Sequence, residues 1–402
     1  MGQALQGVTV VELVDGFWAS LGTTFMADFG AQVVKVVPGG SPVGGLVKAH
    51  RDVPPEHVRF LYQLVGRNKL SAALDISAEE GQELLRRLAA AADVFVSDWS
   101  RRDLQALGLD YESLRARRED VVYVTASGFG QDGPDADLPN LDELAAARTG
   151  LMPILPQPGQ PPVYAGHGQI YGSGLLLLGT SIALWHRERT GEGQWVDVSL
   201  LAAGIYGATL DVQAYLAMRS ERFLRPISRY DAGNPMSGTY YMTSDGRWLT
   251  LTMPDTDRYW PRLAPLVGLD PADPRFDSHE KRCEVNRLEL IRLLEEAFRG
   301  ATADHWKRAM EEHDLSGDII EDYSYPANDR FARQNGYILS LSHPVMGQLD
   351  LLGFPIYMSE TPAALDRLAP CSGQHTAQAL RSLLGLSEEE VVGLQQKGIL
   401  RV

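Results

Sequence analysis

The sequence predicts an α/β fold in which a doubly wound, mainly parallel sheet forms a large domain that is accompanied by a smaller α+β domain. Short β-branched runs alternate with helix-length segments over the first half of the chain, which is typical of βαβ units. After about Arg225, glycine, proline and aromatic residues become frequent and a hairpin pattern appears. The chain of 402 residues is also longer than one hydrophobic core usually organises.

Five apolar runs are predicted to be strands of the parallel sheet. They are residues 8–13, 33–37, 71–76, 94–96 and 121–124. The segments between them are long enough for helices, one of which is predicted from Leu104 to Arg117. In an open sheet of this kind ligands bind beyond the carboxyl ends of the strands, so the glycine-rich segment after the fifth run is a candidate site edge.

The remaining pattern predicts further helices, a strand and the domain boundaries. Helical periodicity marks residues 142–150, 171–188 and 200–218, and residues 194–198 form a strand. The most apolar stretch, Ile170 to Trp185, is interrupted by glycine, serine and threonine, and we expect a buried helix and no membrane span. Ser387 is predicted to cap the last helix. Residues 1–220 and 330–402 are assigned to the large domain, and residues 221–329 to the small domain with its linkers.

Composition excludes several classes of function. The net charge is −15, from 37 basic and 52 acidic side chains, which disfavours a nucleic-acid partner because such partners need clustered basic residues. The two cysteines, Cys283 and Cys371, stand in no CxxC or metal-ligand spacing, so neither a disulfide framework nor a metal site is expected. Without an export signal or a membrane anchor at its start, the chain is expected in the cytoplasm.

The segment after the fifth predicted strand places carboxylates close to a glycine-rich loop. Gly128, Phe129, Gly130 and Gln131 are followed by an acidic stretch and then by Asp142. A carboxylate at the start of a helix lies at the positive end of the helix dipole and stays ionised. Asp142 could therefore be a reactive group or a simple helix cap, and spacing alone favours the cap.

The order of several motifs resembles the class III CoA-transferases, the family of formyl-CoA and carnitine CoA-transferases. The similar segments run nearly end to end: residues 27–36, 67–69 with 73–75, 92–96 with 107–109, 127–134, 186–198 and 245–249. Each motif alone is weak, but their order and spacing together are specific.

The resemblance implies that Asp142 is the catalytic nucleophile. In this family an aspartate attacks an acyl-CoA thioester, forms an acyl-aspartyl anhydride and then an aspartyl-CoA thioester, and passes CoA to a second carboxylic acid. A carboxylate suits this role because it can hold the acyl group and then CoA without trapping either in a more stable bond. The substrates would be an acyl-CoA and a free carboxylic acid, and the protein would be an interlocked homodimer.

The resemblance also implies binding residues for CoA and for the substrate. CoA contacts are expected from Arg67, Asn68, Lys69, Arg101, Gly128, Phe129, Gly130 and Gln131. Arginine and lysine suit the CoA phosphates, and glycine allows close backbone approach. A loop of the small domain that contains Gly233, Asn234 and Gly238 is expected over the substrate.

Several positions depart from the pattern of the family. Val37 replaces a glutamate, Ser100 replaces an arginine that usually contacts CoA, and Leu141 replaces the tyrosine that often precedes the nucleophile. Related racemases have a histidine at the position of Leu141, so its absence argues against a racemase. Arg101 is the candidate substitute for the missing arginine. Two alternatives remain open: an acyl-CoA racemase or isomerase of the same superfamily, and a non-catalytic homologue that binds CoA esters.

Overall fold

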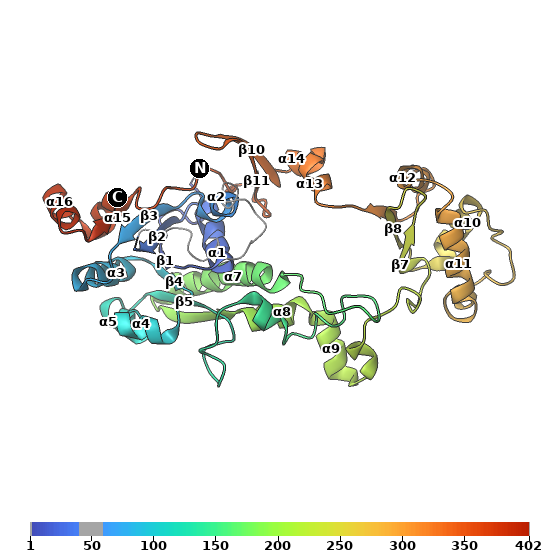
Figure 1. Ribbon diagram of the computed structural model, residues 1–402, viewed down its shortest axis with the longest axis horizontal. Coiled ribbons are helices and arrows are strands. Elements are labelled where there is room, and N and C mark those ends of the chain that lie inside the picture. Colours follow the sequence, from blue (N-terminus) through green and yellow to red (C-terminus); the bar gives the residue numbers. More distant parts are fainter. Residues whose placement is uncertain (1, 40–58, 402) are drawn as a thin grey trace. The chain divides into compact units, whose positions relative to one another are not determined.

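The structure is a computed structural model that describes residues 2–39 and 59–401. The chain divides into two compact units, which are coloured along the sequence in Figure 1. The larger unit contains Met1–Met152, Tyr164–Arg219 and Phe331–Val402, and the smaller contains Pro153–Val163 and Ser220–Arg330. Residues 153–163, which the sequence pattern assigned to the large domain, belong to the smaller unit.

A seven-stranded sheet forms the centre of the larger unit. Its strands are β1 (Thr9–Leu13), β2 (Gln32–Pro38), β3 (Leu70–Leu74), β4 (Val94–Ser97), β5 (Val122–Ser127), β6 (Gln194–Ser199) and β12 (Leu400–Arg401). Their order is β12-β3-β2-β1-β4-β5-β6. Six strands are parallel and only β12 pairs antiparallel, with β3. The predicted α/β class with a mainly parallel sheet is confirmed.

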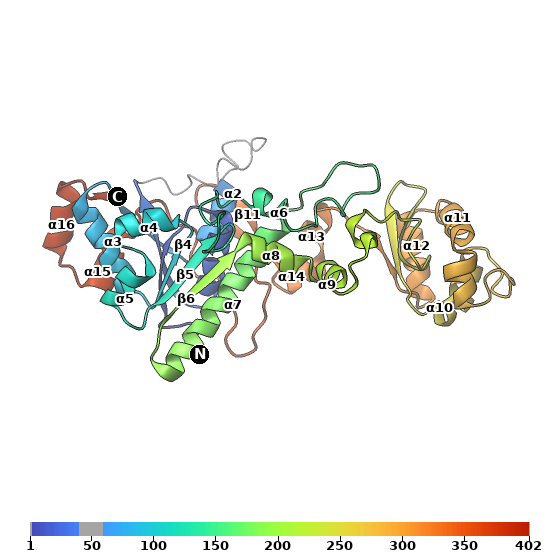
Figure 2. The ribbon, with the colours of Figure 1, turned by 90° about the horizontal axis from the view of Figure 1, so that it is seen from below.

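Helices bury both faces of this sheet (Figure 2). Val10, Val94 and Val124 pack against one helix layer, whereas their neighbours Phe95 and Tyr123 point to the other. Continuous apolar strands of this kind are typical of parallel sheets covered on both sides. The first layer contains α1 (Phe17–Asp28), α7 (His167–Thr190) and α8 (Leu200–Gly207), and the second contains α3 (Glu79–Ala91), α4 (Arg101–Leu107), α5 (Tyr111–Arg117), α15 (Thr376–Leu384) and α16 (Glu388–Gln396).

The other elements of the larger unit are short. They are α2 (Arg59–Gly66), α6 (Asp142–Ala146), α9 (Thr209–Met218) and the antiparallel pair β10 (Ile338–His343) and β11 (Gly347–Leu352), and α14 (Arg330–Gln334) begins at the boundary between the units. The predicted cap of the last helix is confirmed, because Ser387 forms a capping box with Glu390 at the start of α16.

Three helix predictions need correction. The segment 104–117 is not one helix: α4 ends at Gly108, whose φ of 66° suits glycine, and Asp110 caps α5. The segment 200–218 breaks between α8 and α9, which meet at a bend of 78°. The stretch from Ile170 to Trp185 is helical but not buried, since Leu178, Ile182 and Trp185 of α7 are 54%, 58% and 64% exposed.

The described residues include no single helix that is long and apolar enough to cross a membrane. Only the bent pair of α8 and α9, taken together, reaches the length and composition of a span.

The smaller unit combines an antiparallel sheet with helices. The sheet contains β7 (Ser237–Met242), β8 (Trp248–Thr252) and β9 (Gly317–Ile320). The helices are η2 (Glu221–Leu224), α10 (Thr256–Leu266), η3 (Lys281–Val285), α11 (Arg287–Phe298), α12 (Ala303–Glu312) and α13 (Ser324–Asn328). Tyr241, Trp260 and Phe298 are buried in its own apolar core. The hairpin predicted around Asp245 is confirmed by β7 and β8.

Candidate active site

Asp142 is the first residue of α6, but its side chain does not cap that helix. Leu141 is the N-cap residue and has no side-chain cap bond. The Asp142 Oδ2 atom instead accepts a hydrogen bond of 2.6 Å from the Tyr164 hydroxyl. The Oδ1 atom is buried and has no hydrogen-bond partner among the described residues. One oxygen of this carboxylate is thus held in place, while the other has its bonding capacity unused.

The Asp142 carboxylate lies against the first turn of α7. A Cβ atom added to Gly168 would come within 2.4 Å of Asp142 Oδ1, a distance that side-chain carbons do not tolerate. Gly168 is therefore required for the carboxylate to approach the backbone. Because α7 is a 24-residue helix, its amino-terminal N–H groups and dipole place positive potential beside the carboxylate.

Burial raises the pKa of Asp142, because the charged form loses hydration. The Tyr164 hydrogen bond, the backbone N–H of Gln169 and the charge of His167 each act in the opposite direction and lower the pKa. The Gln169 N–H lowers the pKa as a nearby donor, although no contact to Oδ1 has hydrogen-bond geometry. The group is therefore a desolvated carboxylate whose ionised form is favoured by Tyr164, Gln169 and His167.

The glycine-rich loop after β5 packs against the segment that carries Asp142. A Cβ on Gly128 would lie 3.2 Å from Asn140 Cα, so glycine allows this contact. Phe129 lies under the Arg148 guanidinium, and Gly130 has a φ of 96°. The Gln131 amide donates to Asp197 at 2.8 Å. The loop therefore supports the Asp142 segment, and its predicted contacts with CoA stay a prediction.

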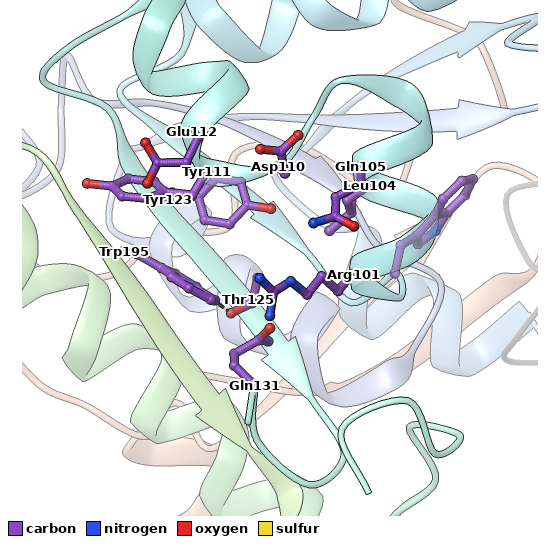
Figure 3. Close-up of a pocket in the computed structure, with 11 residues that line it drawn as sticks. Arg101, Leu104, Gln105, Asp110, Tyr111, Glu112, Tyr123, Thr125, Gln131 and Trp195 are labelled. Atoms are coloured by element: carbon purple, nitrogen blue, oxygen red, sulfur yellow. Dashed lines mark hydrogen bonds between the residues drawn. The ribbon is translucent and has the colours of Figure 1, made fainter. Parts of the chain in front are cut away.

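A cavity of about 150 Å³ lies at the second helix layer, beside this loop (Figure 3). Tyr111, Tyr123 and Trp195 supply aromatic walls. The Arg101 side chain extends across the cavity toward Thr125 and Gln131 in Figure 3. The cavity therefore brings together two of the residues predicted to bind CoA, Arg101 and Gln131. Its volume suits part of a ligand and not a whole CoA molecule.

Arg67 and Asn68 are committed to contacts inside the larger unit. The Arg67 guanidinium is 1% exposed, pairs with Asp28 at 2.7 Å and donates to the carbonyls of Leu352 and Gly353. Asn68 has a φ of 61°, and its amide also donates to Asp28. These bonds tie the turn after α2 to α1 and β11, and they leave the two side chains little capacity for CoA phosphates.

Lys69 is likewise buried in an internal cluster. Its ammonium group is 0% exposed and donates to both carboxylate oxygens of Glu12, at 3.0 and 2.9 Å. Lys35 donates to the same carboxylate at 3.4 Å, and Thr23 also bonds to it. Burial lowers the pKa of Lys69 to about 8. The three predicted residues of this turn thus form structural contacts, and direct binding of CoA by them stays a prediction.

The predicted substrate loop lies in the smaller unit. The Asn234 amide donates to the Met253 and Pro254 carbonyls, and its oxygen accepts from the Met236 N–H. Gly233 and Asn234 line a shallow pocket with His279 and Cys283. Gly238 has a φ of 79°, which suits glycine. Asn234 therefore shapes the loop, and a substrate contact from this loop stays a prediction.

The sequence pattern does not predict two residues of the site. Tyr164 and Gly168 both lie against the Asp142 carboxylate. The only signal was the glycine-containing stretch Gly166–Gly168 directly before a long apolar helix. Within residues 2–39 and 59–401, no group of three or more histidine, cysteine or acidic side chains could hold a metal ion.

Comparison with known proteins shows the family of the chain. The profile of CoA-transferase family III matches residues 5–376. The chain belongs to that family. It is a family III CoA-transferase, an enzyme that transfers CoA between acyl-CoA thioesters and carboxylates. CoA is accordingly a substrate, and the resemblance drawn from the ordered motifs is confirmed.

Characterised relatives and a solved structure agree with the assignment. The chain is 30% identical to the succinyl-CoA:D-citramalate CoA-transferase of Chloroflexus aurantiacus, over 98% of both chains. It is 27% identical to the cinnamoyl-CoA:phenyllactate CoA-transferase of Clostridium sporogenes, over 97% of this chain and 95% of the relative. A CaiB/BaiF family protein from Brucella suis has a similar structure, with a TM-score of 0.79 and 26% identity over 95% of this chain and 100% of that one.

Proposed function

We propose that this CoA-transferase works through covalent intermediates at Asp142. The Asp142 carboxylate attacks the thioester carbonyl of the donor, and CoA thiolate leaves as the acyl-aspartyl anhydride forms. The thiolate then attacks the aspartyl carbonyl, which gives an aspartyl-CoA thioester and releases the donor acid. The acceptor carboxylate attacks this thioester, and the returning thiolate takes the acceptor acyl group and frees Asp142.

The observation that carries the proposal is the buried Oδ1 atom without a partner. An oxygen already saturated by hydrogen bonds is a poor nucleophile, whereas no hydrogen bond uses the lone pairs of Oδ1. Because Oδ1 is buried, the thioester must displace the groups that cover this oxygen to react with it. Tyr164 holds Oδ2 and so fixes the orientation of the carboxyl group. The first turn of α7 lies beside the carboxylate, so its N–H groups and the helix dipole can stabilise negative charge that develops on the attacked carbonyl.

The cavity of Figure 3 is the proposed site for one end of CoA. The aromatic rings of Tyr111, Tyr123 and Trp195 suit stacking with a planar base. The Arg101 guanidinium makes no ion pair with any described side chain, so it is available for a phosphate. In this proposal Arg101 takes the part of the arginine that Ser100 replaces. Gly128 to Gly130 would approach the pantetheine chain.

The acceptor is proposed to be a 2-hydroxy carboxylic acid. Phenyllactate and citramalate, which appear in the names of two relatives, both belong to this chemical class. The first screen therefore compares 2-hydroxy acids with their deoxy counterparts.

We also propose that the enzyme is a homodimer that acts in the cytoplasm. The exposed apolar side chains of α7, Tyr171, Leu178, Ile182 and Trp185, follow one another at helical spacing and form one stripe. A stripe of this kind on a folded unit usually marks a protein interface. Both cysteines are free thiols, which agrees with a reducing compartment.

Trapping with hydroxylamine tests the nucleophile. Hydroxylamine converts an acyl-aspartyl anhydride or thioester into an aspartyl hydroxamate, which peptide mass spectrometry locates. We expect the adduct at Asp142 in the native enzyme, and a loss of turnover of at least about 10³-fold in Asp142→Asn. Glu143→Gln is the matched control, because Glu143 is an exposed neighbouring carboxylate, and it should behave as the native enzyme. Full activity in Asp142→Asn, with no adduct at Asp142 in the native enzyme, would overturn the proposal.

A further inference from the structure

A carboxylate outside the described site lies where the sheet reverses its direction of winding. From β1 the chain proceeds to β2 on one side, whereas β4 and β5 lie on the other. The carboxyl ends of β1 and β4 therefore flank the topological switch point, where ligands of such sheets bind. Asp98 directly follows β4, and Asp15 and Gly16 follow β1.

Asp98 holds the turn between β1 and α1. Its Oδ1 atom accepts from the Asp15 N–H at 3.0 Å, and its Oδ2 atom accepts from the Gly16 N–H at 2.6 Å. On the other side of the same turn, the Lys35 ammonium donates to the Val14 carbonyl at 2.6 Å. The side chains of Asp98 and Lys35 thus hold the backbone of residues 14–16. Gly16 is also the N-cap residue of α1, so the turn sets where that helix begins.

The second residue of α1, Trp18, connects this turn to the Asp142 site. Its indole N–H points to the Asn140 side-chain oxygen at 3.4 Å, and Asn140 precedes Asp142 by two positions. Its carbonyl accepts from the Ser173 hydroxyl of α7 at 2.8 Å. A Cβ on Gly172 would lie 3.0 Å from the Trp18 ring. Trp18 therefore contacts two segments beside the Asp142 carboxylate: the loop before α6 and the first turns of α7.

We propose that Asp98 is a positioning residue for Asp142, acting through the β1–α1 turn, Trp18 and Asn140. The inference rests on the proposed role of Asp142 as the nucleophile. If the turn moved, Trp18 would move with α1, and the carboxylate would lose its alignment with the thioester. A misalignment of about 1 Å can slow a reaction about 10²-fold.

The charge of Asp98 matters because only an ionised carboxylate accepts both backbone bonds without a competing proton. Burial raises the pKa of Asp98 to about 6, and the bonds from Asp15 and Gly16 lower it. The charge of Asp15 raises this pKa further and that of Lys35 lowers it, while Glu12 pairs with Lys35. An assay at pH 8 therefore keeps the group ionised in the native enzyme.

The test compares two aspartates that flank the same strand. Asp98 follows the carboxyl end of β4, and Asp93 precedes the amino end, where it accepts from the Thr9 N–H at 2.8 Å. At pH 8 we expect Asp98→Asn to slow formation of the hydroxylamine-trapped adduct about 10²-fold, with KM for acyl-CoA changed less than about threefold. Asp93→Asn removes a charge at the other end of the strand and its ion pairs with Arg118 and Arg187, but its adduct should form at the native rate.

A second variant keeps the inference testable if Asp98→Asn does not fold. In Gly16→Ala the new Cβ would lie 2.8 Å from Asp98 Oδ2, which displaces the carboxylate while leaving its charge. We expect the same selective loss of rate. A native rate in folded Asp98→Asn or Gly16→Ala, or an equal loss in Asp93→Asn, would overturn the inference. Failure of the nucleophile proposal would look different, because the native enzyme itself would then give no adduct at Asp142.

Discussion

The larger unit contains two sites of buried charge that differ in how completely they are paired. In the cluster of Glu12, Lys35 and Lys69, both carboxylate oxygens have several donors, and the Lys69 ammonium has several acceptors. In the Asp142 carboxylate, one oxygen has a single donor and the other has none. The sequence predicts a function for a residue in each site: CoA binding for Lys69 and catalysis for Asp142. Of these two residues, only Asp142 has a side-chain oxygen that accepts no hydrogen bond.

The difference has a physical basis. A buried charge whose partners use all its bonds is costly to remove and gains nothing from a ligand. A buried carboxylate oxygen that accepts no hydrogen bond can still gain a favourable interaction with a ligand. Completeness of pairing therefore distinguishes Lys69, which stabilises the fold, from Asp142, the proposed nucleophile.

The largest expected effect is on stability, from Lys69→Met. This variant leaves Glu12 buried with fewer partners, so we expect a loss of about 3–5 kcal/mol in the free energy of unfolding. Lys397→Met is the matched control: Lys397 pairs with Glu80 on the surface, with exposures of 60% and 43%, and should lose at most about 1 kcal/mol. Urea denaturation measures both. If Lys69→Met instead kept its stability but bound CoA more weakly in calorimetry, Lys69 would be a CoA ligand and the comparison would fail.

The second prediction concerns the space beside the unpaired oxygen. Gly168→Ala places a Cβ 2.4 Å from Asp142 Oδ1, so the carboxylate must move. We expect kcat to fall about 10²-fold. Gly393→Ala is the control, since Gly393 lies in α16 with nothing near its missing side chain, and kcat should not change. Native kcat in Gly168→Ala would show that the position of Oδ1 does not matter for turnover.

The smallest expected effect comes from the single donor of Asp142. Tyr164→Phe removes a hydrogen bond that favours the ionised carboxylate, so the already raised pKa of Asp142 rises further. In the proposed mechanism the ionised form attacks. The acidic limb of the kcat/KM profile should therefore shift to higher pH, and kcat/KM should fall about tenfold, consistent with a hydrogen bond to a charged group.

Tyr171→Phe controls for the Tyr164 substitution. Its hydroxyl makes no hydrogen bond among the described residues, so its profile should match that of the native enzyme. A shift of the acidic limb to lower pH in Tyr164→Phe would mean that Tyr164 does not stabilise the charge of Asp142.

The parallel sheet was predictable because each strand is specified by a short, local sequence pattern. Runs of valine between helix-length segments specify strands buried on both faces, and β1, β2, β4 and β5 appear where those runs lie. Helix ends were predicted less well. The break at Gly108 depends on one residue with positive φ, and the exposed stripe of α7 depends on which face the fold covers, which apolar content alone does not show.

The sequence by itself determined the class of protein and pointed to Asp142, because motif order and residue type survive without coordinates. Only the tertiary structure decided which partners each charged side chain contacts. Arg67 and Lys69 meet Asp28 and Glu12, partners 39 and 57 positions away, whereas Asp142 meets Tyr164 and Gly168 at the start of α7. Such pairings arise when distant segments pack together, and no local pattern records whether a buried oxygen finds a donor.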